Sequence, residues 1–244
     1  MTVLANPNVC DETQSMKRIT ILLAEDHKVI REGVRMILEL DADLEIVGEA
    51  QTGRYAVALA KKLRPAVVLM DIAMPQLNGL EATRQILTVL PNTRILILSA
   101  HNDEAYLKNA MESGAVGFLL KQSSAHDLRR AIREVSKGHV FFGPFISKLY
   151  LEGERKSWDR AVRSKPRNSG LTSREMEVLQ LIAEGKANKQ TAAELGIGMK
   201  TVEKHRGHLM QKLGIHDTAG LTRYAISEGI IESSVQLTHL PVKS

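Results

Sequence analysis

The sequence predicts an α/β fold with a five-stranded parallel sheet, followed by a small domain made only of helices. Five short apolar runs between residues 19 and 120 alternate with segments whose apolar residues recur at helical spacing, which is the pattern of βα units. Beyond residue 170 the chain reads as four short helices separated by glycines. Of 244 residues, 43% are hydrophobic and only 4% are aromatic, so two domains with aliphatic cores fit better than one.

The first three strands are short and apolar. Residues 19–24 form the first, and an amphipathic helical segment separates it from a second strand at residues 44–48. The next helical segment stops before Pro65, because a residue that precedes proline is disfavoured in the α region. Residues 67–70 then form a continuous apolar run, the mark of a strand buried on both faces, and this run ends at Asp71.

Two more strands complete the predicted sheet. A helix that follows Asn78–Gly79 ends before the strand at residues 94–98. A polar helix over residues 103–113 is closed by a glycine and leads to the strand at residues 116–120. A last helix runs to Lys137–Gly138, so five βα units follow one another.

Acidic side chains stand where two of these strands end. Asp71 ends the third strand, and Glu25 and Asp26 end the first. Ligands of open parallel sheets bind in the crevice outside the carboxyl ends of the strands. A single aspartate there is as often only a cap, but three carboxylates repel one another unless a cation neutralises them, and an all-oxygen cluster suits Mg²⁺. The sequence therefore predicts a Mg²⁺ site centred on Asp71.

The last two strands add a hydroxyl at Ser99 and an ammonium at Lys121. In order and spacing, the acidic pair, the Asp-x-x-Met-Pro run from Asp71, the Ser-Ala pair and the strand-ending lysine resemble the receiver domain of two-component response regulators, over residues 17–140. The resemblance implies a doubly wound sheet with strand order 2-1-3-4-5, which places the ends of strands one and three side by side.

The same resemblance implies a role for each residue of the site. Asp71 would accept a phosphoryl group while Mg²⁺ and an ammonium neutralise its charge. Asp26, Asp71 and the carbonyl of Ala73 would hold the metal, with Glu25 acting through water. The implied phosphoryl-binding and switch residues are Ser99, Ala100, Phe118 and Lys121.

Several of these residues also have plainer interpretations. Glu25 taken alone is a loop charge, and Ser99 is a helix or turn cap. Lys121 taken alone is a solvated lysine, and Phe118 is a core residue. His101, beside the site in sequence, is an exposed loop residue more simply than a catalytic one.

The composition of the chain indicates the cellular compartment in which we expect the protein. The only cysteine, Cys10, lies in a polar tail and has no internal partner, which favours a reducing cytoplasm. No apolar run approaches the roughly 18 residues of a membrane span, and the first residues lack a secretion signal. We therefore expect a cytoplasmic protein without a membrane partner, which starts at Met1 or Met16.

The expected parts of the chain are a tail (1–16), the receiver (17–140), a charged linker (141–169), the helical domain (170–235) and a second tail (236–244).

The helical domain begins with a strong helix signal. Thr172 followed three residues later by Glu175 predicts a capping box. Further helices are expected over residues 188–195, 199–213 and 218–228, with Gly196–Ile197–Gly198 turning the chain before the third. Four short helices with such a turn indicate a helix-turn-helix domain.

Local motifs, not bulk charge, point to nucleic acid. The chain carries a formal charge of +5, but residues 170–235 hold eight basic and eight acidic residues. The Leu-Thr-x-Arg-Glu-x-Glu-Val-Leu run, Thr-Val-Glu-Lys-His and Lys-Leu-Gly resemble the DNA-binding domain of LuxR-type regulators, and with the receiver the chain resembles the NarL/FixJ family. The residues implied to contact DNA are Lys189, Lys200, Thr201, Lys204, His205, Arg206, His208 and Lys212.

The predicted recognition helix departs from its family at three places. Gly198 and Met199 stand where a capping Ser or Thr is common, and Glu203 is acidic within a basic helix. Base preference is therefore not predicted. Apolar side chains of the same helix, those of Val202, Leu209 and Leu213, are expected to face the core of the domain instead.

The favoured function is transcription regulation without enzymatic turnover. A sensor histidine kinase would phosphorylate Asp71, and the modified chain would bind double-stranded DNA as a homodimer. A Mg²⁺-dependent phosphatase is the alternative from another class, but it needs a general acid two residues after the nucleophile, where Ala73 stands. A third alternative is DNA binding independent of phosphorylation. The linker is long enough for the receiver to cover the recognition helix or to leave it free.

Overall fold

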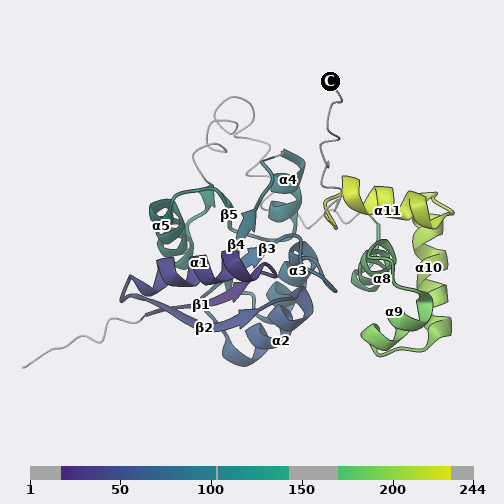
Figure 1. The fold of residues 1–244 in the computed structure, drawn as a ribbon, viewed down its shortest axis with the longest axis horizontal. Coiled ribbons are helices and arrows are strands. Elements are labelled where there is room, and N and C mark those ends of the chain that lie inside the picture. The colour runs from purple at the N-terminus through teal and green to yellow at the C-terminus, as the bar shows by residue number, and fades with distance from the viewer. Residues whose placement is uncertain (1–17, 103, 143–169, 232–244) are drawn as a thin grey trace, which may run out of the picture.

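The computed structural model describes residues 18–102, 104–142 and 170–231 (Figure 1). Its first part, here called the α/β domain, is a six-stranded sheet in the order β2-β1-β3-β4-β5-β6 with every neighbouring pair parallel. The strands are β1 (Ile19–Ala24), β2 (Leu44–Ala50), β3 (Val67–Asp71), β4 (Arg94–Ser99), β5 (Gly117–Leu120) and β6 (Phe141–Phe142). The helices are α1 (Lys28–Glu39), α2 (Gly53–Leu63), α3 (Gly79–Val89), α4 (Glu104–Glu112) and α5 (Ala125–Ser136).

The predicted doubly wound sheet and its order are confirmed, with a sixth strand added. Phe141 and Phe142 pair with Gly117 and Phe118 of β5, just beyond the predicted boundary at residue 140. The chain turns back to the sheet at Gly138, whose φ of +89° favours glycine. Phe141 is buried against α5 and its neighbours, so burial of an aromatic ring holds a strand too short to be read from sequence.

Both faces of the sheet are covered by helices, which explains the continuous apolar run of β3. Val68 and Met70 belong to the core cluster under α2, α3 and α4. Val67 and Leu69 point the other way, into the cluster under α1 and α5. Because all five residues of β3 are buried, its last residue, Asp71, is delivered to the sheet edge from the centre of the core.

The second part, here called the helical domain, has the predicted elements. It consists of α8 (Ser173–Ala183), α9 (Asn188–Leu195), α10 (Met199–Leu213) and α11 (Thr218–Ser227) around one apolar cluster. The capping box is confirmed, because the Thr172 hydroxyl accepts from the Glu175 amide and the Glu175 carboxylate accepts from the Thr172 amide. The turn before α10 is also present, with Gly196 in the left-handed region.

The two domains meet through α8 and just beyond the end of α11, where Gly229 lies against the ring of Tyr106 in α4. Figure 1 shows α8 on the side of the helical domain that faces α2 and α3, whereas α10 lies on the outer side. The predicted tails and the predicted linker beyond residue 142 lie outside the described residues. Among the helices that the structure describes, none has the length and apolarity needed to cross a membrane.

Substitution of two glycines, one in a crowded position and one in open space, tests this packing. A Cβ added to Gly79, the first residue of α3, would lie 1.9 Å from the carbonyl oxygen of Asp71, whereas one added to Gly33 in α1 would meet nothing within 4 Å. We expect Gly79→Ala to lower the free energy of unfolding by about 1–3 kcal/mol, because backbone must move to make room. Gly33→Ala should raise it by about 0.5–1 kcal/mol, since alanine loses less entropy in a helix. Urea unfolding measures both, and equal midpoints for the two variants would contradict this account.

Candidate functional site

The polar strand ends predicted from sequence meet at one edge of the sheet. Strand β1 lies between β2 and β3, so Glu25 and Asp26, which follow β1, are next to Asp71 at the end of β3. Ser99 ends β4, and Lys121 follows β5 with its amide donating to the Ser99 carbonyl at 2.8 Å. Parallel strands put all their carboxyl ends at the same edge, which gathers five side chains from four strands.

Lys121 lies at the centre of this cluster of side chains. Its Nζ lies 2.9 Å from Asp71 Oδ1 and 3.0 Å from Glu25 Oε2. Glu25 is fully buried and Asp71 is only 2% exposed, while the lysine side chain keeps 13% exposure. The ammonium therefore bridges two carboxylates in a region poor in water, where an ion pair is screened little.

The surroundings of Asp71 change its acidity. Burial and then the charge of Glu25 raise the pKa of Asp71, Lys121 opposes both, and the net result is a rise from the ordinary value of 3.8 to about 7. Burial lowers the pKa of Lys121, but the carboxylates of Asp71 and Glu25 outweigh it, so the net shift is upward and the side chain is an ammonium. Without an added cation, the site therefore holds less negative charge near neutral pH than three carboxylates would suggest.

The carboxylates are spaced to share a cation. One ligand atom from each of Glu25, Asp26, His27 and Asp71 lies within 4.8 Å of all the others. Asp71 Oδ2 is buried and has no hydrogen-bond partner within the described part of the chain, so it is an acceptor left for a ligand. Carboxylate oxygens are the donors that Mg²⁺ prefers, and the receiver family, which these residues resemble, binds Mg²⁺ in an acidic pocket of this kind.

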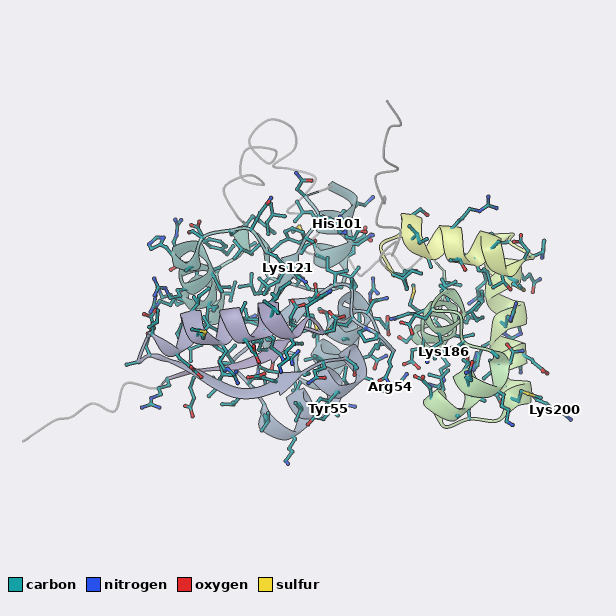
Figure 2. The ribbon with its side chains drawn as sticks, in the orientation of Figure 1. Arg54, Tyr55, His101, Lys121, Lys186 and Lys200 are labelled. Atoms are coloured by element: carbon teal, nitrogen blue, oxygen red, sulfur yellow. The ribbon has the colours of Figure 1, made fainter. Side chains whose placement is uncertain are left out.

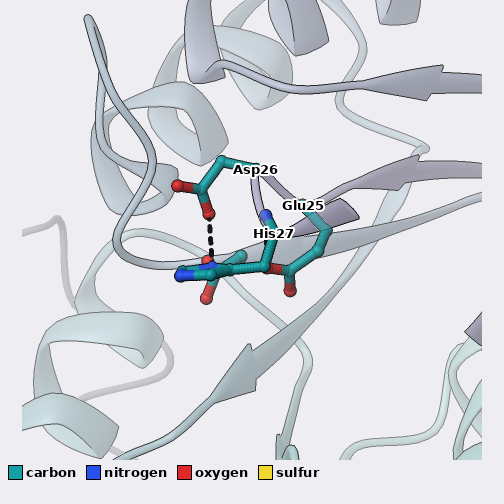
Figure 3. Close-up of side chains that lie close together, drawn as sticks. Glu25, Asp26 and His27 are labelled. Atoms are coloured by element: carbon teal, nitrogen blue, oxygen red, sulfur yellow. Dashed lines mark hydrogen bonds and ion pairs between the residues drawn. The ribbon is translucent and has the colours of Figure 1, made fainter. Parts of the chain in front are cut away.

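His27 belongs to this cluster, although the sequence analysis did not select it. Figure 3 shows its ring against the acidic pair, with Nδ1 at 2.9 Å from Asp26 Oδ1 and 3.1 Å from Glu25 Oε1. Partial burial lowers the pKa of His27, but the charges of Asp26 and Glu25 raise it more, so the net shift is upward. A side chain whose positive charge these carboxylates favour thus flanks them. Its place directly after the acidic pair was the only available sequence signal.

Arg31 is a second residue that sequence reasoning missed. It is 6% exposed, and its Nη1 donates to the carbonyl oxygen of Glu25 at 2.8 Å and to that of Asp26 at 3.3 Å. Its Nε donates to Glu49 Oε2 at 3.1 Å. Through the two Nη1 bonds, Arg31 holds the backbone of Glu25 and Asp26 in place. The signal was an arginine on the otherwise apolar face of α1 that holds Val34 and Leu38.

The residues predicted to sense a phosphoryl group occupy defined positions. The Ser99 hydroxyl donates to the carbonyl of His101 at 3.1 Å and accepts from the amide of His101 at 3.0 Å, so here it serves the plainer role of a loop cap. Phe118 is 1% exposed within the core, and Ala100 is exposed. The switch role of these residues remains a prediction.

The second candidate site is the outer face of α10. Lys200, Lys204 and His208 follow one another at intervals of four residues, so they form one stripe along the helix, and all three are exposed. Figure 2 shows Lys200 at the outer edge of the helical domain, opposite the side that Arg54 faces. Thr201 and Lys189 are also exposed. Val202 and Leu209 are fully buried and Leu213 is partly buried against the same cluster, as predicted.

Other basic residues of α10 bind within the domain instead. Arg206 donates to Asn188 Oδ1 at 3.2 Å and to Thr218 Oγ1 at 2.7 Å, which ties α10 to α9 and α11. Lys212 donates to Glu175 Oε2 at 2.6 Å. His205 is only half-exposed. His208 Nδ1 also lies 4.0 Å from Glu175 Oε1, so the stripe approaches α8 at its C-terminal end, while Lys200 and Lys204 lie at its outer end.

Comparison with known proteins divides the chain into the same two domains. A family model for the response regulator receiver domain matches residues 21–133, and one for bacterial regulatory proteins of the luxR family matches residues 169–225. Transcriptional regulatory protein DegU of Brevibacillus brevis is 34% identical over 234 residues, or 91% of this chain and 99% of its own length. Transcriptional regulatory protein LiaR of Bacillus subtilis (strain 168) is 39% identical over 207 residues, or 85% of this chain and 96% of its own length.

A solved structure is also similar. The two-component response regulator RcsB in complex with DNA has a TM-score of 0.53 and 26% identity, covering 86% of this chain and 98% of that one. RcsB has also been solved as two dimers bound to two parallel DNAs, with 27% identity and a TM-score of 0.53 over 86% of this chain and 98% of that one.

The raised pKa of Asp71 predicts how stability depends on pH. Between its unfolded value of 3.8 and its folded value of about 7, the folded chain holds a proton that the unfolded chain has released, so stability falls as pH rises through that window. Asp71→Asn removes this loss. In EDTA we expect the variant to be more stable than the wild type at pH 8, by up to about 4 kcal/mol, and nearly equal to it at pH 4.

Urea unfolding at the two pH values measures the difference. Mg²⁺ added at pH 8 should stabilise the wild type more than the variant, because a ligand stabilises only the state that binds it. A variant that is less stable than the wild type at pH 8 in EDTA would refute the assignment of a raised pKa to Asp71.

Proposed function

The chain belongs to the bacterial response regulators in which a receiver domain precedes a LuxR-type DNA-binding domain, and from this we propose that a sensor histidine kinase phosphorylates Asp71 to control DNA binding. Its relatives are transcriptional regulators, so the proposed activity is regulation of transcription, in the compartment that holds the DNA, and not turnover of a substrate. The observation that carries the proposal is the ammonium of Lys121 held 2.9 Å from one buried carboxylate oxygen of Asp71.

In the proposed reaction, an oxygen of Asp71 attacks the phosphorus atom of a phosphohistidine on the kinase. The new O–P bond forms as the P–N bond breaks, and the electron pair leaves with the imidazole, which is protonated from solvent. Lys121 offsets the negative charge brought to Asp71. Because only the ionised carboxylate is a nucleophile, the raised pKa of Asp71 makes transfer depend on positive charge at the site.

We assign the metal to Asp26, Asp71 and the carbonyl of Ala73, with Glu25 acting through water. Mg²⁺ bound there supplies the positive charge that favours ionised Asp71 and neutralises phosphoryl oxygens. The free Oδ2 of Asp71 and the close spacing of the cluster support this assignment. Glu25 has a further task in this chain, because it contacts Lys121 and so keeps the ammonium beside Asp71.

We also propose that the outward stripe of α10 contacts double-stranded DNA and that the chain binds as a homodimer. The stripe presents Lys200 and Lys204 on one side of an exposed helix, with Thr201 and His208 beside them. The related regulator RcsB has been solved as dimers on DNA, which supports the same state here. Arg206 and Lys212 are assigned the role of bracing α10, since both are engaged within the domain.

Phosphorylation is tested by labelling. Incubation with acetyl phosphate and Mg²⁺ should give one acid-stable, base-labile adduct, and peptide mapping should place it on Asp71. Asp71→Asn should remove it, because the amide has the same volume but no nucleophilic oxygen. Asp43→Asn is the matched control, since Asp43 precedes β2 and lies at the opposite edge of the sheet, where its partner is Arg133. Normal labelling of Asp71→Asn would disprove the phosphoacceptor assignment.

The DNA face is tested by salt dependence. Each lysine that contacts a phosphate contributes about 0.9 to the slope of log affinity against log salt. We expect Lys200→Ala and Lys204→Ala each to reduce that slope by about 0.9 for any duplex, specific or not. Lys62→Ala, at an exposed lysine of α2 in the other domain, is the control. Fluorescence anisotropy over a salt series measures the slope, and an unchanged slope in both α10 variants would remove this face from the proposed site.

A further inference from the structure

The helical domain forms hydrogen bonds with the segment that directly follows Asp71. Gln180, on α8, accepts a hydrogen bond from the amide of Asn78 at 2.6 Å and donates one to the carbonyl of Met74 at 2.9 Å. Both bonds go to backbone atoms, so one side-chain amide spans the two ends of the same loop. Gln180 is 1% exposed and Asn78 is 2% exposed, so water does not compete for these bonds.

That loop, residues 72–78, is a rigid extension of the Asp71 site. The amides of Met74 and Gly79 both donate to the carbonyl of Ile72, at 3.1 and 2.8 Å. Gly79 approaches the peptide of Asp71 so closely that no side chain fits there. The loop is tied at both ends to the residue after Asp71, so we expect a shift at Met74 or Asn78 to move the backbone of Asp71 and Ala73.

A neighbouring contact holds the loop in a strained shape. Gln76 has a φ of +67°, which is rare for a residue other than glycine. Its amide donates to Glu184 Oε1 of α8 at 3.2 Å, and Gln180 Nε2 donates to the same carboxylate oxygen at 2.7 Å. Burial raises the pKa of Glu184, and the bonds from Gln180 and Gln76 partly offset that effect. The helical domain thus supplies partners for a loop conformation that is unfavourable by itself.

Glu177 extends the contact to α2 and α3. It accepts from Gln85 Nε2 at 3.0 Å and lies 3.5 Å from Nη2 of Arg54. Glu177 is only 6% exposed. This part of the interface therefore consists of side chains with defined hydrogen bonds, and α8 with its C-cap residue supplies three of them along one face, at positions 177, 180 and 184.

We propose that Gln180 is a positioning residue for the phosphoacceptor loop, through which the DNA-binding domain opposes phosphorylation of Asp71. This rests on the proposed function of Asp71. A phosphoryl group adds three oxygens to a carboxylate that is 2% exposed, so the loop beside it must move. While Gln180 holds Met74 and Asn78, that movement costs both hydrogen bonds. Coupling of two sites is reciprocal, so a phosphoryl group at Asp71 weakens the grip of α8 by the same factor.

The test is the equilibrium affinity of the full chain for beryllofluoride, a non-covalent mimic of the phosphoryl group, in the presence of Mg²⁺. In Gln180→Met the side chain keeps its length but loses its hydrogen bonds to Asn78, Met74 and Glu184. We expect it to bind beryllofluoride about fivefold more tightly or better, within the usual range of coupling between sites. Glu184→Ala, which removes the acceptor for the Gln76 amide, should shift the affinity in the same direction. Gln211→Ala, at an exposed glutamine of α10, should not.

The outcomes separate this inference from the function on which it rests. If the wild type binds beryllofluoride, Asp71→Asn does not, and Gln180→Met binds with wild-type or lower affinity, the positioning role is refuted and the phosphoacceptor assignment stands. If neither the wild type nor Gln180→Met binds, both are refuted. A purely structural role for Gln180 predicts a lower melting temperature at unchanged affinity, which also counts against the proposal. Where Gln180→Met does not fold, the Glu184→Ala affinity decides.

Discussion

The ion pair between Lys121 and Asp71 is the interaction on which the α/β domain is arranged. It joins the ends of β3 and β5, which are not neighbours in the sheet, and through Glu25 it also reaches the end of β1. Burial would drive Asp71 to take up a proton, and the ammonium beside it offsets part of that cost. Arg31 donates to the backbone of Glu25, and the ring of His27 contacts the carboxylate of Asp26. The site is therefore charged, buried and held by cations supplied by the chain itself.

The basic residues of α10 are divided in a comparable way. A helix that carries many cations can use them for DNA only when its position is fixed by other contacts. Arg206 and Lys212 supply such contacts, to α9, α11 and the capping glutamate of α8, while Lys200 and Lys204 remain directed outward. The buried Val202 and Leu209 set which side faces out. Orientation of the helix, and with it the charge available to a phosphate backbone, follows from the core of the domain.

The interface between the domains leaves that outer face uncovered. Because α8 and not α10 contacts the α/β domain, the receiver does not lie over the recognition helix in this arrangement, which is one of the two possibilities that the long linker allowed. Communication between the domains can then pass through α8 and the loop after Asp71, through the contact of Gly229 with Tyr106 in α4, or through a change in how two copies of the chain associate. Gln180 offers a direct path of the first kind, since its partners belong to the loop that directly follows Asp71.

The sequence by itself determined the strands, their polar ends, the helix bounds of the second domain and its capping box. These features depend on residues a few positions apart: alternation of apolar runs, a proline after α2, and Thr172 three residues before Glu175. Strand order came from resemblance, and β6 was too short to carry a pattern. Only the tertiary structure decided that Glu25 contacts Lys121, 96 residues away, that Arg206 turns inward, and that Gln180 binds a loop 102 residues earlier. Such contacts leave no local signal, because a side chain finds its partner only after the intervening chain has packed.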